Sequence, residues 1–310
     1  MVTQNNDKKL SVIIGIPAYN EGQNIKNLLT DLLAQDTTNF ELQKIIVTCD
    51  NCSDNTALEA NSLNSPLIEV WDNKDRLGQA GRQNEILTKV DCDVLILLNA
   101  DILPYDDKFL FNLVEPTYKH DADLVAAKII PSKADTLFCS IIHASVRAKN
   151  SVFETYKDGH NLYTCHGTSR AFTKKLYRQL DFKKVVAEDA YSYLTTVTNG
   201  MKYYFAEDAI AFYKLPSNLK DHIRQSSRFL NGIDELHKYF TQDQLDEAYY
   251  YPKDDMIKAL IDEFVHNPFL ITSYFFILAY VKVKEKFKKD KAFSGVWESV
   301  SSTKAPVKQI

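Results

Sequence analysis

Acidic residues stand at three places where predicted elements of the chain begin or end. Asp50 closes the apolar run KIIVTCD, and Asp101 follows the apolar run VLILLNA. Glu188 and Asp189 come just before a helical pattern farther along the chain. In an open parallel sheet, ligands bind in the crevice outside the carboxyl ends of the strands. We therefore expect these carboxylates to share one pocket, and their order suggests the handling of an activated nucleotide.

These acids can meet only if the chain builds a sheet, and its apolar pattern predicts one. Apolar, β-branched runs alternate with helical patterns, as is typical of βαβ units. Strands are predicted at 11–17, 44–48, 66–71, 93–100, 122–130, 162–172 and 202–213. Helices are predicted at 24–35, 79–90, 174–179, 189–198 and 218–239, with a further one that Ser53 or Asp54 caps. The predicted fold class is α/β, with a mostly parallel central sheet flanked by helices.

Composition and charge limit the classes of protein. The chain has 310 residues, of which 45% are hydrophobic, and its 17 Tyr and 17 Phe argue against disorder. The formal net charge is -4. Proteins that neutralise nucleic-acid phosphates are usually basic. We therefore expect no nucleic acid as a partner.

The cysteines permit two interpretations. Five cysteines and a polar N-terminus, MVTQNNDKKL, point to the reducing cytosol. Cys49 and Cys52 form a C-x-x-C sequence at a predicted strand end, which a redox pair would explain. The alternative is that both are small residues flanking a ligand-binding acid, Asp50. The other three cysteines include no closely spaced pair, so a zinc site is not predicted.

Five short motifs follow one another along the chain. They are SVIIGIPAYNEG from Ser11, DNCSDNT from Asp50, NAD from Asn99, EDA from Glu188 and QSSRF from Gln225. In this order and spacing, the chain resembles the family 2 glycosyltransferases of the GT-A fold between residues 10 and 235. The resemblance implies inverting transfer of a sugar from a nucleotide-diphosphate donor to an acceptor hydroxyl, usually with a divalent metal.

The resemblance also implies how the chain is divided. Residues 1–105 correspond to the nucleotide-sugar-binding half of a Rossmann-like GT-A domain, and residues 106–240 to its acceptor-binding and catalytic half. Residues 241–310 lie beyond the resemblance and are expected to form a helical C-terminal extension.

The motif IPAYNEG corresponds to donor-binding residues of the family. Pro17 would end a strand and turn the backbone toward the nucleotide, Tyr19 belongs to the same donor-binding group, and Glu21 would accept hydrogen bonds from the base or the ribose. The alternative is an ordinary strand-to-helix turn, in which the helix dipole favours an acid at the position of Glu21.

Two further positions correspond to donor contacts. Asp50 matches an acid that reads the edge of the nucleobase, and because a carboxylate accepts hydrogen bonds from an N–H such as that of uracil, uridine is the preferred base. Arg76, in the stretch RLGQAGRQN, matches a basic residue that meets the donor. The alternatives are a solvated turn residue at Asp50 and solvent-facing side chains for Arg76 and Arg82.

The metal motif departs from the family pattern. The family's D-x-D is here Asn99-Ala100-Asp101, so only one carboxylate is present. The resemblance assigns the metal contact to Asp101 and leaves Asn99 to hydrogen-bond a ribose hydroxyl. Mg²⁺ or Mn²⁺ takes oxygen ligands and commonly keeps waters and substrate phosphates in its shell, so one protein carboxylate can serve as a minimal anchor. The alternative is that Asp101 caps a helix and binds no metal.

The pair Glu188-Asp189 matches the acidic pair of the family. An acceptor hydroxyl that attacks the anomeric carbon must lose its proton, and a positioned carboxylate accelerates such steps by ~10²–10⁴-fold. The resemblance assigns this role to Asp189, with Glu188 supporting it. The alternative is a helix cap.

His166, in HGTSRAF, matches the acceptor side or is a structural histidine.

Gln225, Arg228 and Phe229 match the family's Q-x-x-R-W signature with Phe in place of Trp. The signature is commoner among polysaccharide-type members. Positions three apart share a helix face, so the guanidinium of Arg228 can neutralise the leaving diphosphate while the ring stacks on an acceptor sugar. The alternative is an amphipathic helix with Phe229 in the core.

The C-terminal region changes character. Residues 268–281 are apolar but shorter than the ~20 residues of a membrane-spanning helix. The stretch KVKEKFKKDK follows at 282–291, with six Lys against one Glu and one Asp. An apolar helix beside lysines predicts peripheral contact of 268–291 with anionic lipid at the inner face of the cell membrane. The alternative is a helix packed on the catalytic domain.

Three classes of function remain open at this stage. The first is an inverting transferase that uses a nucleotide-diphosphate sugar, with a glycan or lipid-linked acceptor and Asp189 as general base. The second is a nucleotide-sugar-binding protein that has lost catalysis, because Asn99 and Phe229 depart from the family pattern. The third is a thiol redox protein built on Cys49 and Cys52.

Overall fold

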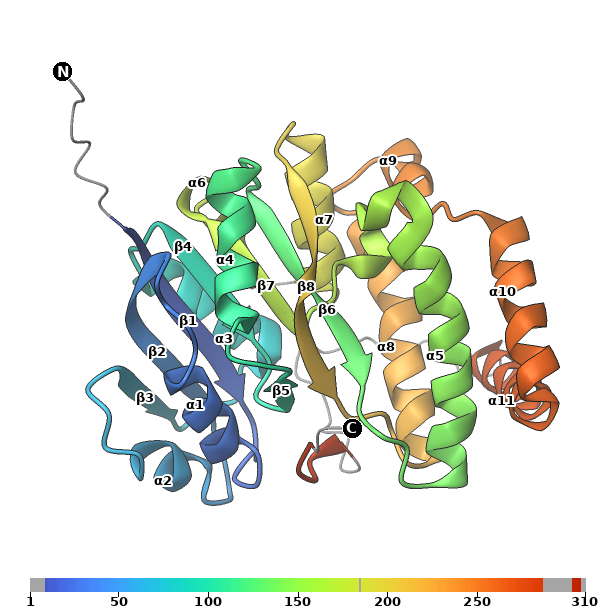
Figure 1. Ribbon diagram of the computed structural model, residues 1–310, viewed down its shortest axis with the longest axis horizontal. Helices are drawn as coiled ribbons and strands as arrows, with labels where there is room; N and C mark the ends of the chain where they lie inside the picture. The colour runs from blue at the N-terminus through green and yellow to red at the C-terminus, as the bar shows by residue number, and fades with distance from the viewer. Residues whose placement is uncertain (1–8, 184, 287–302, 308–310) are drawn as a thin grey trace.

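A computed structural model describes residues 9–183, 185–286 and 303–307. Its centre is an eight-stranded sheet in the order β3-β2-β1-β4-β7-β6-β8-β5, with helices on both faces (Figure 1). The strands are β1 (Leu10–Ala18), β2 (Phe40–Asp50), β3 (Ile68–Asn73), β4 (Val94–Leu98), β5 (Ile102–Pro104), β6 (Leu124–Pro131), β7 (Ser169–Thr173) and β8 (Tyr203–Tyr213). The α/β class is therefore confirmed.

The helices connect these strands and continue beyond them. They are α1 (Ile25–Leu33), α2 (Thr56–Asn61), α3 (Gly78–Lys89), α4 (Phe109–Lys119), α5 (Leu137–Thr155), α6 (Lys174–Tyr177), α7 (Glu188–Thr198), α8 (Leu219–Leu236), α9 (Gln242–Ala248), α10 (Lys253–His266) and α11 (Pro268–Lys286). Short 3₁₀ turns lie at Tyr156–Gly159 and Leu162–Thr164.

The sheet is mixed. The strands β3, β2, β1 and β4 are parallel neighbours, and β6 pairs in parallel with β8. The strand β7 is antiparallel to both β4 and β6, and β5 is antiparallel to β8. Antiparallel pairing therefore begins at β7, in the less regular second half of the sequence. The site described below is built on the parallel half.

Two layers of apolar side chains explain why β1 and β4 are central. Along β1, Ile14 packs into the core on one face of the sheet and Ile13 into the core on the other face. Continuous apolar runs are typical of parallel strands that are covered on both faces. Gly15 allows a close approach at this point, because a Cβ there would lie 2.8 Å from Cδ1 of Ile86 on α3.

The structure corrects two details of the predicted elements. The run 162–172 is not one strand, because residues 162–164 form a 3₁₀ turn and β7 begins only at Ser169. Helices α4 and α5 have no counterpart among the predicted elements, whereas α9 and α10 lie within residues 241–310, where a helical extension is predicted. In α4 the reason is visible in the sequence, since Pro116 lies inside the helix and proline normally ends one.

The C-terminal helices α10 and α11 pack against α5. Arg147 on α5 forms an ion pair with Glu263 on α10, and Lys149 on α5 donates a 2.9 Å hydrogen bond to the hydroxyl of Tyr274 on α11. Tyr274 also joins an apolar cluster with Ile141 and Ile142 of α5. Among the helices that the structure describes, none has both the length and the apolar character to span a membrane.

Candidate active site

The site lies where the chain leaves β1 and β4 in different directions. These two parallel strands are neighbours, and the chain continues from β1 to β2 on one side of the pair and from β4 to β5 on the other side, so a crevice is expected at their carboxyl ends. A cavity of about 210 Å³ occupies this position. Its wall includes Pro17, Tyr19, Glu21, Asp50, Arg76, Asn99 and Asp101. The structure thus brings all seven predicted donor-side residues to one cavity.

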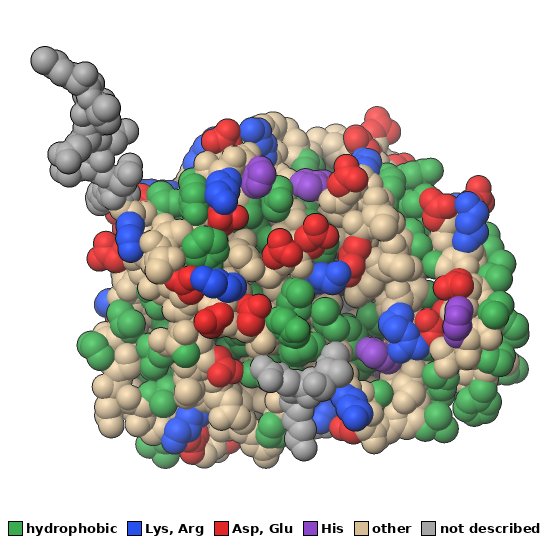
Figure 2. Space-filling view, in the orientation of Figure 1, with side chains coloured by type: hydrophobic (Ala, Val, Ile, Leu, Met, Phe, Trp, Pro, Cys, Tyr) green, Lys and Arg blue, Asp and Glu red, His purple; other side chains and the backbone are tan. Residues whose placement is uncertain are grey.

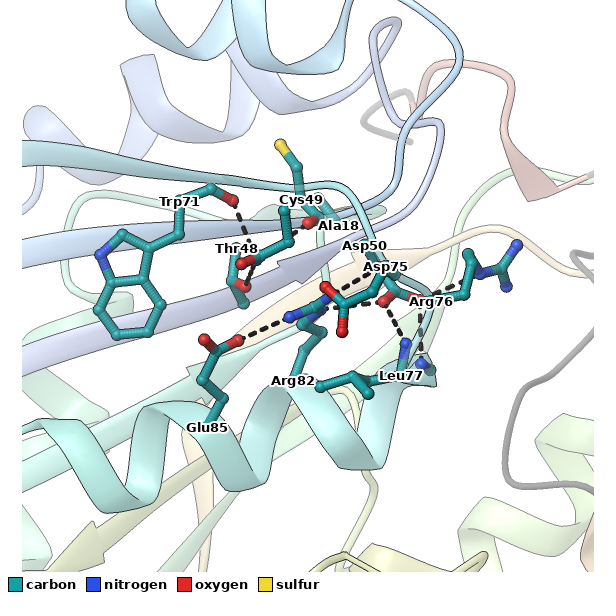
Figure 3. Close-up of polar contacts among 12 residues, drawn as sticks. Ala18, Thr48, Cys49, Asp50, Trp71, Asp75, Arg76, Leu77, Arg82 and Glu85 are labelled. Atoms are coloured by element: carbon teal, nitrogen blue, oxygen red, sulfur yellow. Dashed lines mark hydrogen bonds and ion pairs between the residues drawn. The ribbon is translucent and has the colours of Figure 1, made fainter.

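Asp50 is the centre of a buried network beside this cavity (Figure 3). Its Oδ1 accepts hydrogen bonds from the backbone N–H of Leu77 at 2.7 Å and from Nε of Arg82 at 2.9 Å. Its Oδ2 accepts from the N–H of Gly78 at 3.0 Å and lies 3.2 Å from Nε of Arg76. An ionised carboxylate has about four acceptor positions, and three of them accept hydrogen bonds from the protein here, while the guanidinium of Arg76 forms an ion pair beside them. Little hydrogen-bonding capacity of Asp50 is left for a nucleobase.

Arg82 is buried by this network and does not face solvent. Only 1% of the residue is exposed, and its guanidinium also pairs with Asp75 and Glu85. Gly78 has a φ of 76°, a conformation that residues with a side chain rarely adopt, and this directs its N–H to Asp50. The network therefore fixes the turn that leads into α3.

Tyr19 and Arg76 form a second wall of the cavity. The guanidinium carbon of Arg76 lies 3.5 Å from the centroid of the Tyr19 ring. Stacking on an aromatic ring fixes the orientation of an arginine side chain. That Tyr19 and Arg76 contact the donor stays a prediction.

Glu21 and Asp101 are two carboxylates in one poorly hydrated region. Glu21 is 4% exposed, and its backbone N–H donates to the hydroxyl of Thr56 at 2.8 Å. Burial, together with repulsion from Asp101, raises the pKa of Glu21 to about 7. Burial also raises the pKa of Asp101. It is therefore energetically unfavourable for Glu21 and Asp101 to be ionised together unless a cation lies beside them.

Gln79 connects the donor-side motif with the acidic pair of α7. Its side-chain amide Nε2 donates to Oδ1 of Asn99 and to Oε1 of Glu188, both at 3.0 Å. Glu188 is 8% exposed. The amide group of Gln79, which lines the cavity, thus links Asn99 to Glu188, 89 positions farther along the chain.

Arg170 on β7 holds the start of α7 through hydrogen bonds. It is fully buried, and its Nη1 donates to the backbone carbonyl of Glu188 and to Oγ of Ser192, both at 2.9 Å. The carboxylate of Glu188 lies 4.0 Å from Nη2 of Arg170. A buried arginine at this position holds Glu188 and keeps the beginning of the helix in place.

Asp189 lies next to this fixed pair. Its Oδ1 accepts a 2.8 Å hydrogen bond from the N–H of Ala190, as a helix-start acid would. Its Oδ2 lies 3.5 Å from the place that a Cβ on Gly167 would take. The predicted base is therefore beside the segment that contains His166. Burial lowers the pKa of His166, and the charge of Asp189 opposes that shift.

The predicted residues of α8 are described in part. The side chain of Gln225 lines the cavity. Arg228 and Phe229 lie on the same helix, but their side chains are outside the described residues. Their roles stay predictions.

The two cysteines of the C-x-x-C sequence join two loops of the site. All five cysteines are free thiols. Cys52 accepts a hydrogen bond from the N–H of Asn20 and donates to the carbonyl of Ala18, both at 3.4 Å. A hydrogen bond from Cys49 lowers the pKa of Cys52 to about 6. The contacts favour a packing role between the loops after β1 and β2.

Several residues of the site were not singled out from the sequence. They are Gln79, Thr168, Arg170, Lys214, Thr303 and Lys304. Gln79 lies within the stretch RLGQAGRQN, which resembles a donor-binding segment of the family, so a role in the site could have been predicted for it. Arg170 follows the HGTS sequence, but nothing in a single sequence shows that an arginine is buried. The sequence around Thr303 and Lys304 contains no motif that indicates a site.

The cavity offers few protein ligands for a divalent cation. The part of the chain that the structure describes has no group of three or more His, Cys, Asp or Glu side chains arranged for a metal. Asp101 and Glu21 offer the carboxylate oxygens that Mg²⁺ or Mn²⁺ takes. A cation held here would draw its other ligands from waters and from phosphates of a bound substrate.

Solved structures share this fold at low sequence identity. A mannosyltransferase from Pyrobaculum calidifontis in complex with GDP-Man and Mn²⁺ is 16% identical, with a TM-score of 0.59, and the match covers 89% of this chain and 76% of that one. Glucosyl-3-phosphoglycerate synthase from Mycobacterium tuberculosis in complex with Mn²⁺, UDP and phosphoglyceric acid is 12% identical, with a TM-score of 0.53 and coverage of 74% and 78%. Mannosyl-3-phosphoglycerate synthase from Rubrobacter xylanophilus is 15% identical, with a TM-score of 0.52 and coverage of 75% and 77%.

These similarities define the class of fold, which is that of the GT-A glycosyltransferases. The model of the family "Glycosyl transferase family 2" matches residues 13–181, more than half of the chain. The chain therefore belongs to glycosyl transferase family 2 and is a glycosyltransferase. No curated protein matches the sequence.

Proposed function

We propose that this enzyme transfers a sugar, with inversion at the anomeric carbon, from a nucleotide-diphosphate donor to a hydroxyl of a glycan or lipid-linked acceptor. The observation that supports this best is the shared cavity at the ends of β1, β2 and β4, with Glu21, Asp50 and Asp101 in its wall. The donor in this proposal is a UDP-sugar. Two of the three structural neighbours are bound to GDP-Man or to UDP, which supports a nucleotide sugar as the substrate class.

The donor half of the proposal uses residues 1–105. The stacked Tyr19 and Arg76 form one wall for the nucleotide, while the Asp50 network keeps the turn before α3 in place. Asn99 hydrogen-bonds the ribose in this proposal, and Gln79 fixes the orientation of its amide. A divalent cation at Asp101 would neutralise charge that develops on the leaving diphosphate.

The catalytic half of the proposal uses residues 106–240. Asp189 accepts the proton of the acceptor hydroxyl as the oxygen attacks the anomeric carbon, and the nucleoside diphosphate leaves from the opposite face. Attack opposite the leaving group inverts the anomeric configuration. Glu188, held by Gln79 and Arg170, positions the start of α7 and with it Asp189.

The acceptor side of the proposal uses residues of α8 and of the segment before β7. Gln225 reaches the cavity, and His166 lies on the segment beside Asp189. In the proposal these two residues and Phe229 border the acceptor, and Arg228 pairs with the leaving diphosphate. The Q-x-x-R-F sequence supports a polysaccharide-type acceptor among the possible glycans.

A thermal-shift screen of UDP-sugars and GDP-sugars, with and without Mn²⁺, tests the proposal. A ligand that binds only the folded chain raises its unfolding temperature. We expect UDP-sugars to stabilise the protein most when Mn²⁺ is present, and slow release of UDP from the same sugars. Asp101→Ala should remove most of the difference between the titrations with and without Mn²⁺. Identical Mn²⁺ dependence in the variant would contradict the role of Asp101.

The same screen separates the rival classes. Donor binding without any release of UDP would select a binding protein that has lost catalysis. On the redox alternative, the double variant Cys49→Ala/Cys52→Ala should lose its activity. On the present proposal, UDP release by this variant stays within a few-fold of wild type once folding has been verified.

We further propose that α11, within residues 268–291, binds an anionic membrane from the cytoplasmic side. On α11, Phe269, Phe276 and Val283 are 64%, 74% and 56% exposed, although Ile271, Tyr274 and Val281 on the same helix are buried. Figure 2 shows hydrophobic side chains along the edge that α10 and α11 form. Helix α11 therefore packs on α5 through its buried side chains and also presents an exposed apolar face. Exposed apolar patches of this kind usually mark an interaction surface.

The charges on this surface favour lipid contact through α11. Lys282 and Lys284 are exposed at the C-terminal end of α11, next to its apolar face. Exposed acids lie on α10 instead, among them Asp254 and Asp262. Basic residues close to an anionic membrane contribute ~1 kcal/mol each, so the lysines of α11 supply the attraction.

Sedimentation with phosphatidylserine vesicles tests the membrane proposal. The double variant Phe269→Ser/Phe276→Ser should bind about a hundred-fold more weakly, because each buried Phe side chain contributes ~1.5–3 kcal/mol. Leu58→Ser is the matched control, since Leu58 on α2 is 74% exposed and lies outside this surface. Equal sedimentation of wild type and the double variant rejects the proposal.

A further inference from the structure

The C-terminal segment 303–307 contributes residues to the donor cavity. In Figure 1 it lies beyond the arrowheads of the central strands. Thr303 and Lys304 line the cavity. The ammonium of Lys304 forms an ion pair with the carboxylate of Glu21 and donates a 2.9 Å hydrogen bond to the backbone carbonyl of Tyr19. Asn24 donates a 3.0 Å hydrogen bond to the carbonyl of Lys304, which fixes the backbone as well.

The position of this ammonium is unusual for a lysine. Its side chain is only 26% exposed, and its partner Glu21 is 5% exposed. The charge also acts on Asp101. Burial raises the pKa of Asp101, and the ammonium of Lys304 opposes that rise. Lys304 therefore places a positive charge close to both Glu21 and Asp101.

A diphosphate that enters this region needs positive charge. Glu21 and Asp101 would repel it, and the family's first metal-motif acid is replaced here by Asn99. The cation of Arg82 is already committed to Asp50, Asp75 and Glu85. An ammonium group has three N–H donors. Among the described contacts of Lys304, two acceptors, Tyr19 O and Glu21 Oε1, use two of them.

We propose that Lys304 is a donor-binding residue whose ammonium binds the diphosphate of the nucleotide sugar. It keeps its contact with Glu21 and gives a charge-assisted hydrogen bond to a diphosphate oxygen. This inference rests on the proposed function, because it takes a nucleoside diphosphate as the ligand of the cavity. It extends the site to a residue some 200 positions beyond the metal motif in the chain.

Calorimetric titration with UDP in the presence of Mg²⁺ tests the inference on the full-length protein. Lys304→Met should bind UDP about 10- to 100-fold more weakly than wild type, the loss expected for one charge-assisted hydrogen bond. Uridine lacks the diphosphate, so its weak binding, measured by ligand-observed NMR, should be equal in both proteins. Lys304→Arg keeps the charge and should recover most of the affinity for UDP.

Two further proteins complete the comparison. A chain that ends at Ser302 should show the same loss as Lys304→Met, which guards against an effect of the methionine itself. Lys258→Met is the matched control, because Lys258 on α10 is exposed and pairs only with the exposed Asp255 among the described residues. Its affinity for UDP should equal that of wild type. Circular dichroism and unfolding temperatures establish that each protein is folded.

The possible outcomes separate this inference from the proposed function. If wild type binds neither UDP nor GDP, the proposed function fails and the inference fails with it. If wild type binds UDP and both Lys304→Met and the shortened chain bind it equally well, only the inference fails. Tighter binding by the two altered proteins also overturns it, because the ammonium would then compete with the ligand for Glu21.

Discussion

The variant Asp189→Asn is expected to bind the donor as wild type does and to release UDP from a UDP-sugar about 10²–10⁴ times more slowly. Asparagine has nearly the same shape but cannot accept the proton that the attacking oxygen must lose. Oδ1 of Asp189 is already engaged by the N–H of Ala190, so the proton would go to Oδ2 beside Gly167. Water serves as the acceptor in this assay, so the glycan need not be known.

The control must separate a base from a helix-start acid. Asp243 lies in the first turn of α9 and is exposed, so it has the helix-start position of Asp189 without the neighbouring site residues. Asp243→Asn should change the free energy of unfolding by less than ~1 kcal/mol and leave UDP release unchanged. If Asp189→Asn turns over as fast as wild type, Asp189 is not the base.

The parallel half of the fold could be predicted from the sequence because its strands are buried on both faces. The runs that become β1, β2 and β4 are almost continuously apolar, and each is followed by polar residues at the carboxyl end of the strand. Parallel neighbours place these ends at one edge, so the approach of Asp50 and Asp101 to a common cavity followed from the pattern. The antiparallel insertion of β7 between β4 and β6 did not follow, because long-range pairing leaves no local signal.

The partners of the charged residues could not be predicted in the same way. The sequence left Arg82 open to solvent, whereas three acids spread over residues 50–85 hold it in the interior. Arginine is almost never fully buried unless it is paired, and pairing is a property of the folded chain. The same reason applies to Arg170 and to Lys304, whose partners lie far away in sequence.

Replacing Asp50 with Asn should lower the free energy of unfolding by about 3 kcal/mol, the scale of breaking a buried ion pair. Asn keeps one acceptor oxygen and turns an N–H toward groups that are themselves donors, including Nε of Arg82. Because Arg82 is 1% exposed, water cannot replace the lost partner. Urea denaturation measures the change, and the turn of Leu77 and Gly78 should lose its order in hydrogen exchange.

Asp75→Asn is the matched control, because Asp75 pairs with the same guanidinium of Arg82 but its side chain is 65% exposed. An exposed pair contributes ~0–1 kcal/mol, so the free energy of unfolding of this variant should remain close to that of wild type.

The comparison of the two variants also decides between two roles of Asp50. If Asp50→Asn weakens UDP binding while the free energy of unfolding stays within ~1 kcal/mol of wild type, the carboxylate mainly reads the nucleobase, and the structural role argued from its three hydrogen-bond donors is wrong. If stability falls as expected and the remaining folded protein still distinguishes UDP from GDP, the base is selected by other groups of the cavity.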